Sequence, residues 1–440
     1  MDRYCNNVGV CVPRVLLPKE GSNFMKWAVV ACDQYTSQPE YWASAKKFVG
    51  KAPSTLELIL PEAFLGKPEE KEKIASIRQH MRDYLKTGVL EEKPQGFVLV
   101  TRTVAGQTRT GLVMALDLDA YDYHKGAVTL IRATEGTIES RIPPRLKIRE
   151  GAPLELPHIL VLIDDPEKTV IEPLVADQKR FSLLYNTDLM LGGGHIEGRL
   201  VSEEPAILGV LSALDKLANP ESFGNKYGEG AAPLLFAMGD GNHSFATAKA
   251  YWEKIKAQLP EEERVDHPAR YALVEVENVH DDGIVFEPIH RVVFGLFGNG
   301  AIEKLQKVLK TQNGDVCVQL GEHKAAGGDV KHVLPFITGE TSGAFIVEKP
   351  VQQLAVGTLQ SAIDAVLAEN PGAEVDYIHG VDVVRELIKT GNAIGFLLPS
   401  MGKKELFPTV IYDGALPRKT FSMGEANEKR YYMECRLIEK

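Results

Sequence analysis

Apolar and polar positions along the chain repeat with two periods, one typical of helices and one typical of strands. Residues 69–90 carry apolar side chains three or four positions apart among charged ones, which predicts a helix that ends at Gly88. Residues 96–103 and 109–118 are strand-like runs joined by a short turn, which predicts a hairpin. Apolar runs predict buried strands at residues 157–163 and 234–238, and the helical period returns at residues 245–259.

This mixture of strands and helices predicts an α/β fold of the mixed, α+β kind. A charged stretch after residue 259 ends the helix there, so we predict two domains, residues 1–262 and residues 263–440. The second is expected to be an α+β domain with strands at residues 270–276, 332–337 and 344–347 and helices at residues 300–310 and 381–390.

Composition narrows the class of protein. The chain has 440 residues, 44% hydrophobic and 25% charged, which is ordinary globular usage and excludes a disordered or collagen-like chain. A net charge of −10 gives no bulk attraction to nucleic acid or anionic lipid. No apolar run reaches the roughly 20 residues of a membrane span, and no secretory signal is evident. We therefore expect a cytoplasmic protein that binds a small molecule, with its oligomeric state left open.

The five cysteines of the chain are widely spaced and form no C-x-x-C pair that would indicate zinc or redox chemistry. We therefore expect reduced thiols.

The most informative segment is the junction at residues 239–244, where an apolar strand turns through G-D-G into a helix. The first amides of a helix lack partners within the helix, so this geometry builds anion sites. Asn242, His243 and Ser244 would add donors beside the Gly241 amide, and Asp240 would hold Mg²⁺ against phosphate oxygens. The alternative is an ordinary glycine turn with a capping side chain.

A second candidate is the basic segment at residues 132–149, which holds five basic and two acidic residues. Arg132 and Arg145 are candidate phosphate ligands, because a guanidinium binds phosphate through two parallel hydrogen bonds. Glu135 lies among these cations and is a candidate general base or metal ligand. The alternative is a solvated face on which the arginines pair with neighbouring acids.

Two further motifs would supply cations and hydroxyls to an anion. His290 and Arg291 stand side by side after a predicted strand, and Arg418, Lys419 and Thr420 follow a glycine turn near the end of the chain. The alternative for each motif, an ordinary surface turn or solvated loop, is favoured over a binding role.

The order of these motifs resembles the domain of unknown function numbered 1015 over nearly the whole chain. The resemblance is carried by a D-G-[HN]-H box at residues 240–243, a [TI]-H-R box at residues 289–291 and a P-x-K-[ST] box at residues 417–420. Residues 27–42 also look like one branch of that family.

The first box also resembles the phosphate-binding box of the ParB/sulfiredoxin-like superfamily, which includes nucleotide hydrolases and kinases of free serine. This resemblance implies an N-terminal core of that fold. The chain departs from the box at Asn242, in place of His, and at Ser244, in place of Arg. Loss of that Arg removes a phosphate clamp, so either Arg132, Arg145 or Lys419 replaces it from elsewhere in the chain or the activity differs.

Together the motifs and the resemblance predict a nucleotide-dependent phosphotransferase that acts on a small hydroxylated metabolite, with free serine as the first candidate. The donor would be ATP or ADP with Mg²⁺. The assigned roles are Asp240 for Mg²⁺, His243 for phosphate and catalysis, Arg145 and Lys419 for charge neutralisation, and Glu135 or Asp33 for the hydroxyl proton. The alternatives are a non-catalytic module that binds a nucleotide or a phosphorylated metabolite, and a nucleotide hydrolase.

Overall fold

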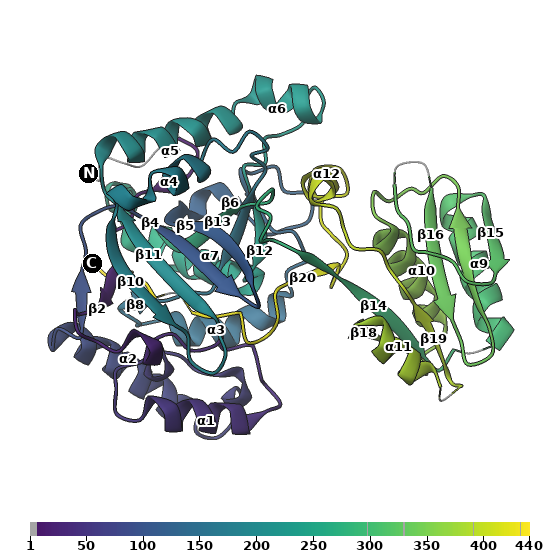
Figure 1. Cartoon of the computed structure of the whole chain (residues 1–440), viewed down its shortest axis with the longest axis horizontal. Coiled ribbons are helices and arrows are strands. Elements are labelled where there is room, and N and C mark those ends of the chain that lie inside the picture. Colours follow the sequence, from purple (N-terminus) through teal and green to yellow (C-terminus); the bar gives the residue numbers. More distant parts are fainter. Residues whose placement is uncertain (1–6, 297, 329–330, 390, 432) are drawn as a thin grey trace. The chain divides into compact units, whose positions relative to one another are not determined.

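The structure is a computed structural model that describes residues 7–296, 298–328, 331–389, 391–431 and 433–440 (Figure 1). The chain divides into two units. One consists of Met1–Ile284 with Gly424–Lys440, and the other of Val285–Met423. The division differs from the predicted boundary at residue 262, because the strand Tyr271–Asn278 is inserted between two strands of the first unit.

The first unit is built on a 10-stranded mixed sheet with the order β10-β11-β4-β5-β13-β9-β12-β7-β6, and β1 pairs with β5. The strands of this unit are β1 (Val10–Cys11), β2 (Leu16–Pro18), β3 (Leu90–Glu92), β4 (Phe97–Val104), β5 (Gln107–Asp117), β6 (Tyr121–Asp122), β7 (Ile131–Arg132), β8 (Leu154–Glu155), β9 (Leu160–Ile163), β10 (Ser182–Asp188), β11 (His195–Val201), β12 (Phe236–Asp240), β13 (Tyr271–Asn278) and β21 (Arg436–Leu437). The short pairs β2–β3 and β8–β21 lie outside the large sheet.

The first unit also contains the following helices. They are α1 (Pro39–Val49), α2 (Glu70–Lys86), α3 (Ile142–Arg149), α4 (Glu172–Ala176), α5 (Glu204–Leu217), α6 (Pro220–Tyr227), α7 (Asn242–Lys256) and α8 (Glu261–Arg264). Buried residues of α5 and α7, such as Leu214 and Trp252, join strand residues such as Met114 and Val161 in one core. Within the described part of the chain, no helix is both long and apolar enough to cross a membrane.

The second unit contains a seven-stranded sheet with the order β15-β17-β16-β19-β14-β18, and β20 pairs with β14. Its elements are β14 (Phe286–Phe294), α9 (Gly298–Asn313), β15 (Val316–Leu320), β16 (His332–Ile337), β17 (Ser342–Val347), α10 (Ala355–Glu369), β18 (Glu374–His379), α11 (Val381–Ile388), β19 (Ala393–Phe396), α12 (Leu406–Tyr412) and β20 (Phe421–Met423). His290 and Arg291 therefore lie within β14 rather than after a strand.

The mixed α/β fold class is confirmed, and most predicted elements lie where the sequence pattern put them. The hairpin is β4 and β5, paired antiparallel, and the first predicted helix is α2. The apolar runs are β9 and β12, and the helix after the G-D-G turn is α7, which begins at Asn242.

The expectation of five reduced thiols is wrong at Cys11, which is disulfide-bonded. Cys32, Cys317 and Cys435 are free.

A buried polar group ties the C-terminal segment to the large sheet. Tyr185 of β10 donates a 2.7 Å hydrogen bond to Glu434, which is almost wholly buried. Burial raises the pKa of Glu434 to about 7, although the hydrogen bond from Tyr185 opposes this effect. A carboxyl whose pKa is higher in the folded chain than in the unfolded chain stabilises the fold only while it is protonated.

We therefore expect the free energy of unfolding to fall between about pH 5 and about pH 8, because folded Glu434 binds its proton more tightly than the unfolded chain does. In Glu434→Gln this contribution is absent. The difference in free energy of unfolding between wild type and Glu434→Gln, measured by urea denaturation, should change by about 2 to 3 kcal/mol between about pH 5 and about pH 8. Glu439→Gln, at an exposed position nearby, is the control. A parallel pH profile for Glu434→Gln and wild type would contradict this prediction.

Candidate functional site

The turn between β12 and α7 depends on a glycine. Gly241 has φ +82°, and a Cβ there would lie 2.5 Å from the carbonyl oxygen of His158. The Gly241 amide donates to Asp240 Oδ1 at 2.7 Å. Helix α7 begins without a capping side chain among the described residues, and the first amides of a helix have no partner within the helix itself. Asn242 Oδ1 is buried and has no hydrogen-bond partner in that part of the chain.

Asp240 forms the electrostatic centre of this turn. Its Oδ2 lies 3.0 Å from Lys429 Nζ and 3.4 Å from His158 Nε2. Burial raises the pKa of the Asp240 carboxyl, but the His158 hydrogen bond and the charge of Lys429 outweigh it and hold the pKa well below its usual value. Burial likewise lowers the pKa of Lys429, and Asp240 outweighs this and raises it. The pair is therefore charged near neutral pH.

The segment before α3 closes over the start of α7. Thr134 donates to the carbonyl oxygen of Met238 at 2.6 Å, and the amide of Ile138 donates to His243 Nε2 at 3.2 Å. Because His243 Nε2 accepts this hydrogen bond, that ring nitrogen carries no proton. The imidazole thereby holds the segment before α3 in place. Glu135 lies between these two anchors and contributes to the raised pKa of Lys429.

A second ion pair lies beside the first. Arg145 of α3 donates to Glu62, and burial raises the pKa of Glu62 while Arg145 lowers it and Asp33 raises it further. Asp33 also contributes to the raised pKa of Lys429. Burial, and then the charge of Asp33, raises the pKa of Cys32 to about 12, so this thiol stays protonated.

The structure thus brings five predicted residues into contact or electrostatic reach of one another through Lys429, Glu62 and the start of α7. They are Asp33, Glu135, Arg145, Asp240 and His243, with Gly241, Asn242 and Ser244 in the same turn.

Arg132 has a different role from the predicted one. It is buried in β7, and its guanidinium donates to the carbonyl oxygens of Thr129, Ala232 and Pro233. These acceptors precede β7 and β12, so the side chain points away from the Asp240 end of the sheet. Its hydrogen bonds hold the segments that lead into β7 and β12, and they leave Arg132 no role as a phosphate ligand.

The other predicted residues belong to the second unit. Arg291 is fully buried and donates to Gln360 and to the carbonyl oxygens of Ile289 and Arg418. His290 accepts from the Leu398 amide, and burial lowers its pKa.

The remaining three predicted residues lie in the loop at residues 417–420, where the Arg418 carbonyl oxygen accepts a hydrogen bond from Arg291. Arg418 pairs with Asp364 at 2.8 Å, and Thr420 donates to the carbonyl oxygen of Pro417 at 2.6 Å. Lys419 has φ +55°, in the left-handed region. These residues form a cluster of their own in the second unit.

Three residues of the site were missed by the sequence analysis: Lys429, Glu62 and His158. Lys429 and Glu62 stand in stretches with no distinctive pattern, and His158 is the one polar residue of the apolar run at residues 157–163, whose pattern predicts only a strand. Tertiary pairing brings all three to α7. For Lys429 this pairing is the bridge between Val30 and Arg430 and the 2.7 Å bond from the Ala31 amide to the Lys429 carbonyl. A lone lysine between charged neighbours gives no signal of such a role.

The carboxylate of Asp240 does not suit the predicted magnesium ligand. Its Oδ1 accepts from the Gly241 amide and its Oδ2 faces Lys429 and His158. No group of three or more His, Cys, Asp or Glu side chains that could hold a metal ion occurs among the described residues. Asp240 therefore acts as the counter-ion of Lys429.

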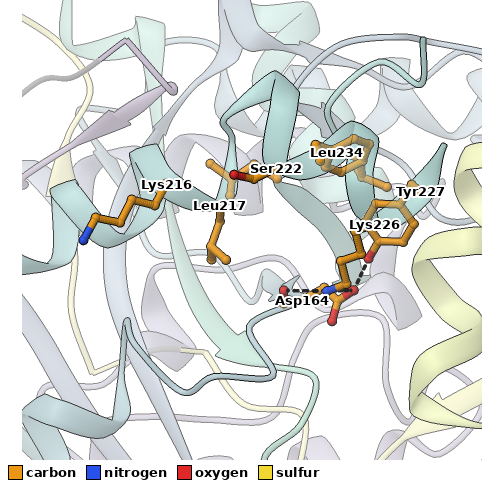
Figure 2. A pocket seen from close by; sticks show the side chains of 9 residues that line it. Asp164, Lys216, Leu217, Ser222, Lys226, Tyr227 and Leu234 are labelled. Atoms are coloured by element: carbon orange, nitrogen blue, oxygen red, sulfur yellow. Dashed lines mark hydrogen bonds and ion pairs between the residues drawn. The ribbon is translucent and has the colours of Figure 1, made fainter. Parts of the chain in front are cut away.

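Figure 2 shows a pocket at the other end of the same sheet, because β9 runs antiparallel to β12 and Asp164 follows β9. Asp164 accepts from Lys226 at 2.7 Å, from His280 at 2.7 Å and from Tyr227. Burial raises the pKa of Asp164, and these donors outweigh it and lower the pKa. The carboxylate of this pocket is thus already satisfied by protein groups.

A family model described as "Protein of unknown function (DUF1015)" matches residues 16–366 of this chain. A solved structure of a conserved hypothetical protein from Pyrococcus furiosus is 12% identical with a TM-score of 0.36, covering 71% of this chain and 90% of that chain. A free serine kinase in complex with AMP is 12% identical with a TM-score of 0.38, covering 72% and 90%. SbnI from Staphylococcus aureus, truncated at its C-terminus, is 11% identical with a TM-score of 0.34, covering 71% and 82%. No curated protein matches the chain.

We expect Asp240 and Lys429 to be coupled in stability, because either charge alone would be partly buried without its partner. A double-mutant cycle with Asp240→Asn and Lys429→Met, read by urea denaturation, should give an interaction energy of about 1 to 3 kcal/mol. The control cycle uses Glu263 and Lys440, whose charged atoms lie 4.0 Å apart on half-exposed side chains. It should give less than about 0.5 kcal/mol. Equal values in the two cycles would contradict the pairing.

Proposed function

The chain belongs to the DUF1015 family, and we propose that its first unit is a nucleotide-dependent phosphotransferase. The nucleotide phosphates bind at the start of α7, ATP or ADP is the donor, and the acceptor is a small hydroxylated metabolite, of which free serine is the first to test.

The observation that carries this proposal is a fixed cation beside an uncapped helix start. The first amides of α7 and the helix dipole favour an anion, and Asp240 holds Lys429 next to them in its charged form. The Asn242 side chain supplies a further polar group at the same turn. An anion with several oxygens, such as a polyphosphate, can meet all of these groups at once.

The carboxylates nearby suit the transfer step. Asp33 and Glu135 both act electrostatically on Lys429, and these two carboxylates are the candidates to take the proton of an acceptor hydroxyl. Arg145 and Lys429 would neutralise charge that develops on the transferred group. His243, through its bond to Ile138, keeps the segment with Glu135 in place.

Phosphate binding makes a direct prediction for Lys429. Isothermal titration of the full chain with ATP or ADP, with and without Mg²⁺, should show binding that Lys429→Met weakens by roughly 10- to 150-fold, the cost of one charge-assisted hydrogen bond. Lys254→Met is the matched control, because Lys254 lies on the exposed side of the same helix and pairs with Glu150. Absence of nucleotide binding in wild type, or equal binding by Lys429→Met, would refute the site.

Turnover separates an enzyme from a binding module. With ATP or ADP, Mg²⁺ and a panel of hydroxy amino acids and small alcohols, phosphorus NMR should detect a phosphorylated product. Glu135→Gln or Asp33→Asn should lower the rate by roughly 10²- to 10⁴-fold, as expected for loss of a general base, and leave nucleotide affinity unchanged. Glu139→Gln, exposed on the same segment as Glu135, is the control.

The other outcomes of this assay are equally informative. Nucleotide binding without any product would favour the non-catalytic module that senses a nucleotide or a phosphorylated metabolite. Release of inorganic phosphate without an acceptor would favour the nucleotide hydrolase. Either result would refute the phosphotransferase.

A further inference from the structure

A layered aromatic cluster lies at the start of α1, in the segment that contains Asp33. The rings of Tyr35 and Tyr41 are stacked, with centroids 4.0 Å apart and planes 8° apart. Tyr41 in turn meets Trp42 edge to face, at 5.6 Å and 84°. Among the described residues, no ring other than that of Tyr41 is in contact with Tyr35. Tyr35 is partly exposed and stacks on Tyr41, whose ring in turn contacts Trp42.

The backbone of Tyr35 is held in an unfavourable conformation. Its φ is +50°, a left-handed value that costs a residue with a side chain about 1 to 2 kcal/mol. Its carbonyl oxygen accepts from the Trp42 indole and from the Gln38 amide, each at 3.2 Å. Such a conformation persists where surrounding contacts enforce it, and these positions cluster at ligand sites.

The same segment is attached to the phosphate site. The Ala31 amide donates to the Lys429 carbonyl at 2.7 Å, and the Cys32 amide donates to the Tyr431 hydroxyl at 3.2 Å. Asp33, two residues before Tyr35, acts electrostatically on Lys429. The aromatic cluster thus begins within a few residues of the cation that Asp240 holds.

Arg430, the residue after Lys429, places a second cation beside the cluster. It is only 2% exposed, and its Nε donates to the Asn427 carbonyl oxygen at 2.7 Å. Burial lowers the pKa of Arg430, and the neighbouring Tyr41 and Tyr35 oppose this effect. Among the described ion pairs none includes Arg430, and its guanidinium lies beside the Tyr41 hydroxyl. The positive charge of Arg430 therefore lies against the two tyrosines, where it favours an anionic ligand on this side of the site.

We propose that the face of Tyr35 turned away from Tyr41 is the platform on which the base of the nucleotide stacks. The inference rests on the proposed function, because the phosphates of that nucleotide occupy the start of α7. Every nucleobase has a flat π surface, and stacking on an aromatic side chain adds affinity with little dependence on which base it is. Tyr35 would therefore make the site select nucleotides over free polyphosphates.

The experiment compares ATP with inorganic tripolyphosphate, which carries the same kind of phosphate chain without a base. Isothermal titration of the full chain should show tighter binding of ATP. Tyr35→Ala should weaken ATP by roughly 5- to 150-fold, the equivalent of one base–aromatic stack, and leave tripolyphosphate unchanged. Tyr35→Phe keeps the ring and should bind ATP like wild type. Tyr35→Leu keeps bulk without the ring and should behave like Tyr35→Ala, which guards against a folding defect in the smaller variant.

Failure of the platform is distinguishable from failure of the phosphate site. If wild type binds ATP and tripolyphosphate equally, or if Tyr35→Ala and Tyr35→Leu keep full ATP affinity, the platform is refuted and the phosphate site stands. If these variants weaken both ligands alike, Tyr35 supports the fold rather than the base, and the platform is again refuted. If wild type binds neither ligand, the proposed function fails, and the platform fails with it.

Discussion

The ion pair between Asp240 and Lys429 joins the two parts of the chain that make the first unit's site. Asp240 ends a buried strand at a turn that only glycine can continue, and Lys429 comes from the last segment of the chain. Without Lys429, a buried carboxylate would face His158 alone. Without Asp240, a lysine would lie half-buried beside a helix start that already carries partial positive charge. Each residue therefore offsets the cost of burying the charge of the other.

Several charged side chains of the first unit are buried, and most of them form ion pairs with other residues of that unit. Arg109 lies 2.8 Å from the fully buried Glu277, and Glu155 meets both Arg149 and Arg436. Such pairs are costly to desolvate and stabilise the fold only when both members are present. Arg430 and Arg132 depart from this pattern, because both are buried and neither occurs in an ion pair of the described residues.

The sequence was most informative where structure is local. Periodicity predicted α2, the β4–β5 hairpin and the β12–α7 junction, because each depends on residues a few positions apart. It could not predict the unit boundary, since Tyr271–Asn278 reads as the first strand of whatever follows, yet pairs with β5 and β9.

Side-chain roles that depend on contacts between distant segments could not be predicted from the sequence either. Arg132 is a residue type that commonly binds phosphate, but its guanidinium donates to three backbone carbonyl oxygens. Lys429, which pairs with Asp240, belongs to no sequence motif. Charge and spacing identify which residues are capable of a role, while the register of distant segments decides which of them take it.

The return of Gly424–Lys440 to the first unit also constrains how the protein is made. In topological terms the second unit is an insertion, and β21 must still find β8 after the inserted residues have been synthesised. Domains fold largely in order as the chain leaves the ribosome. Here the first unit must wait for Gly424–Lys440, so the nascent protein lacks Lys429 until the whole second unit has been synthesised. An early stop codon would remove the site even though the sequence of its helix was intact.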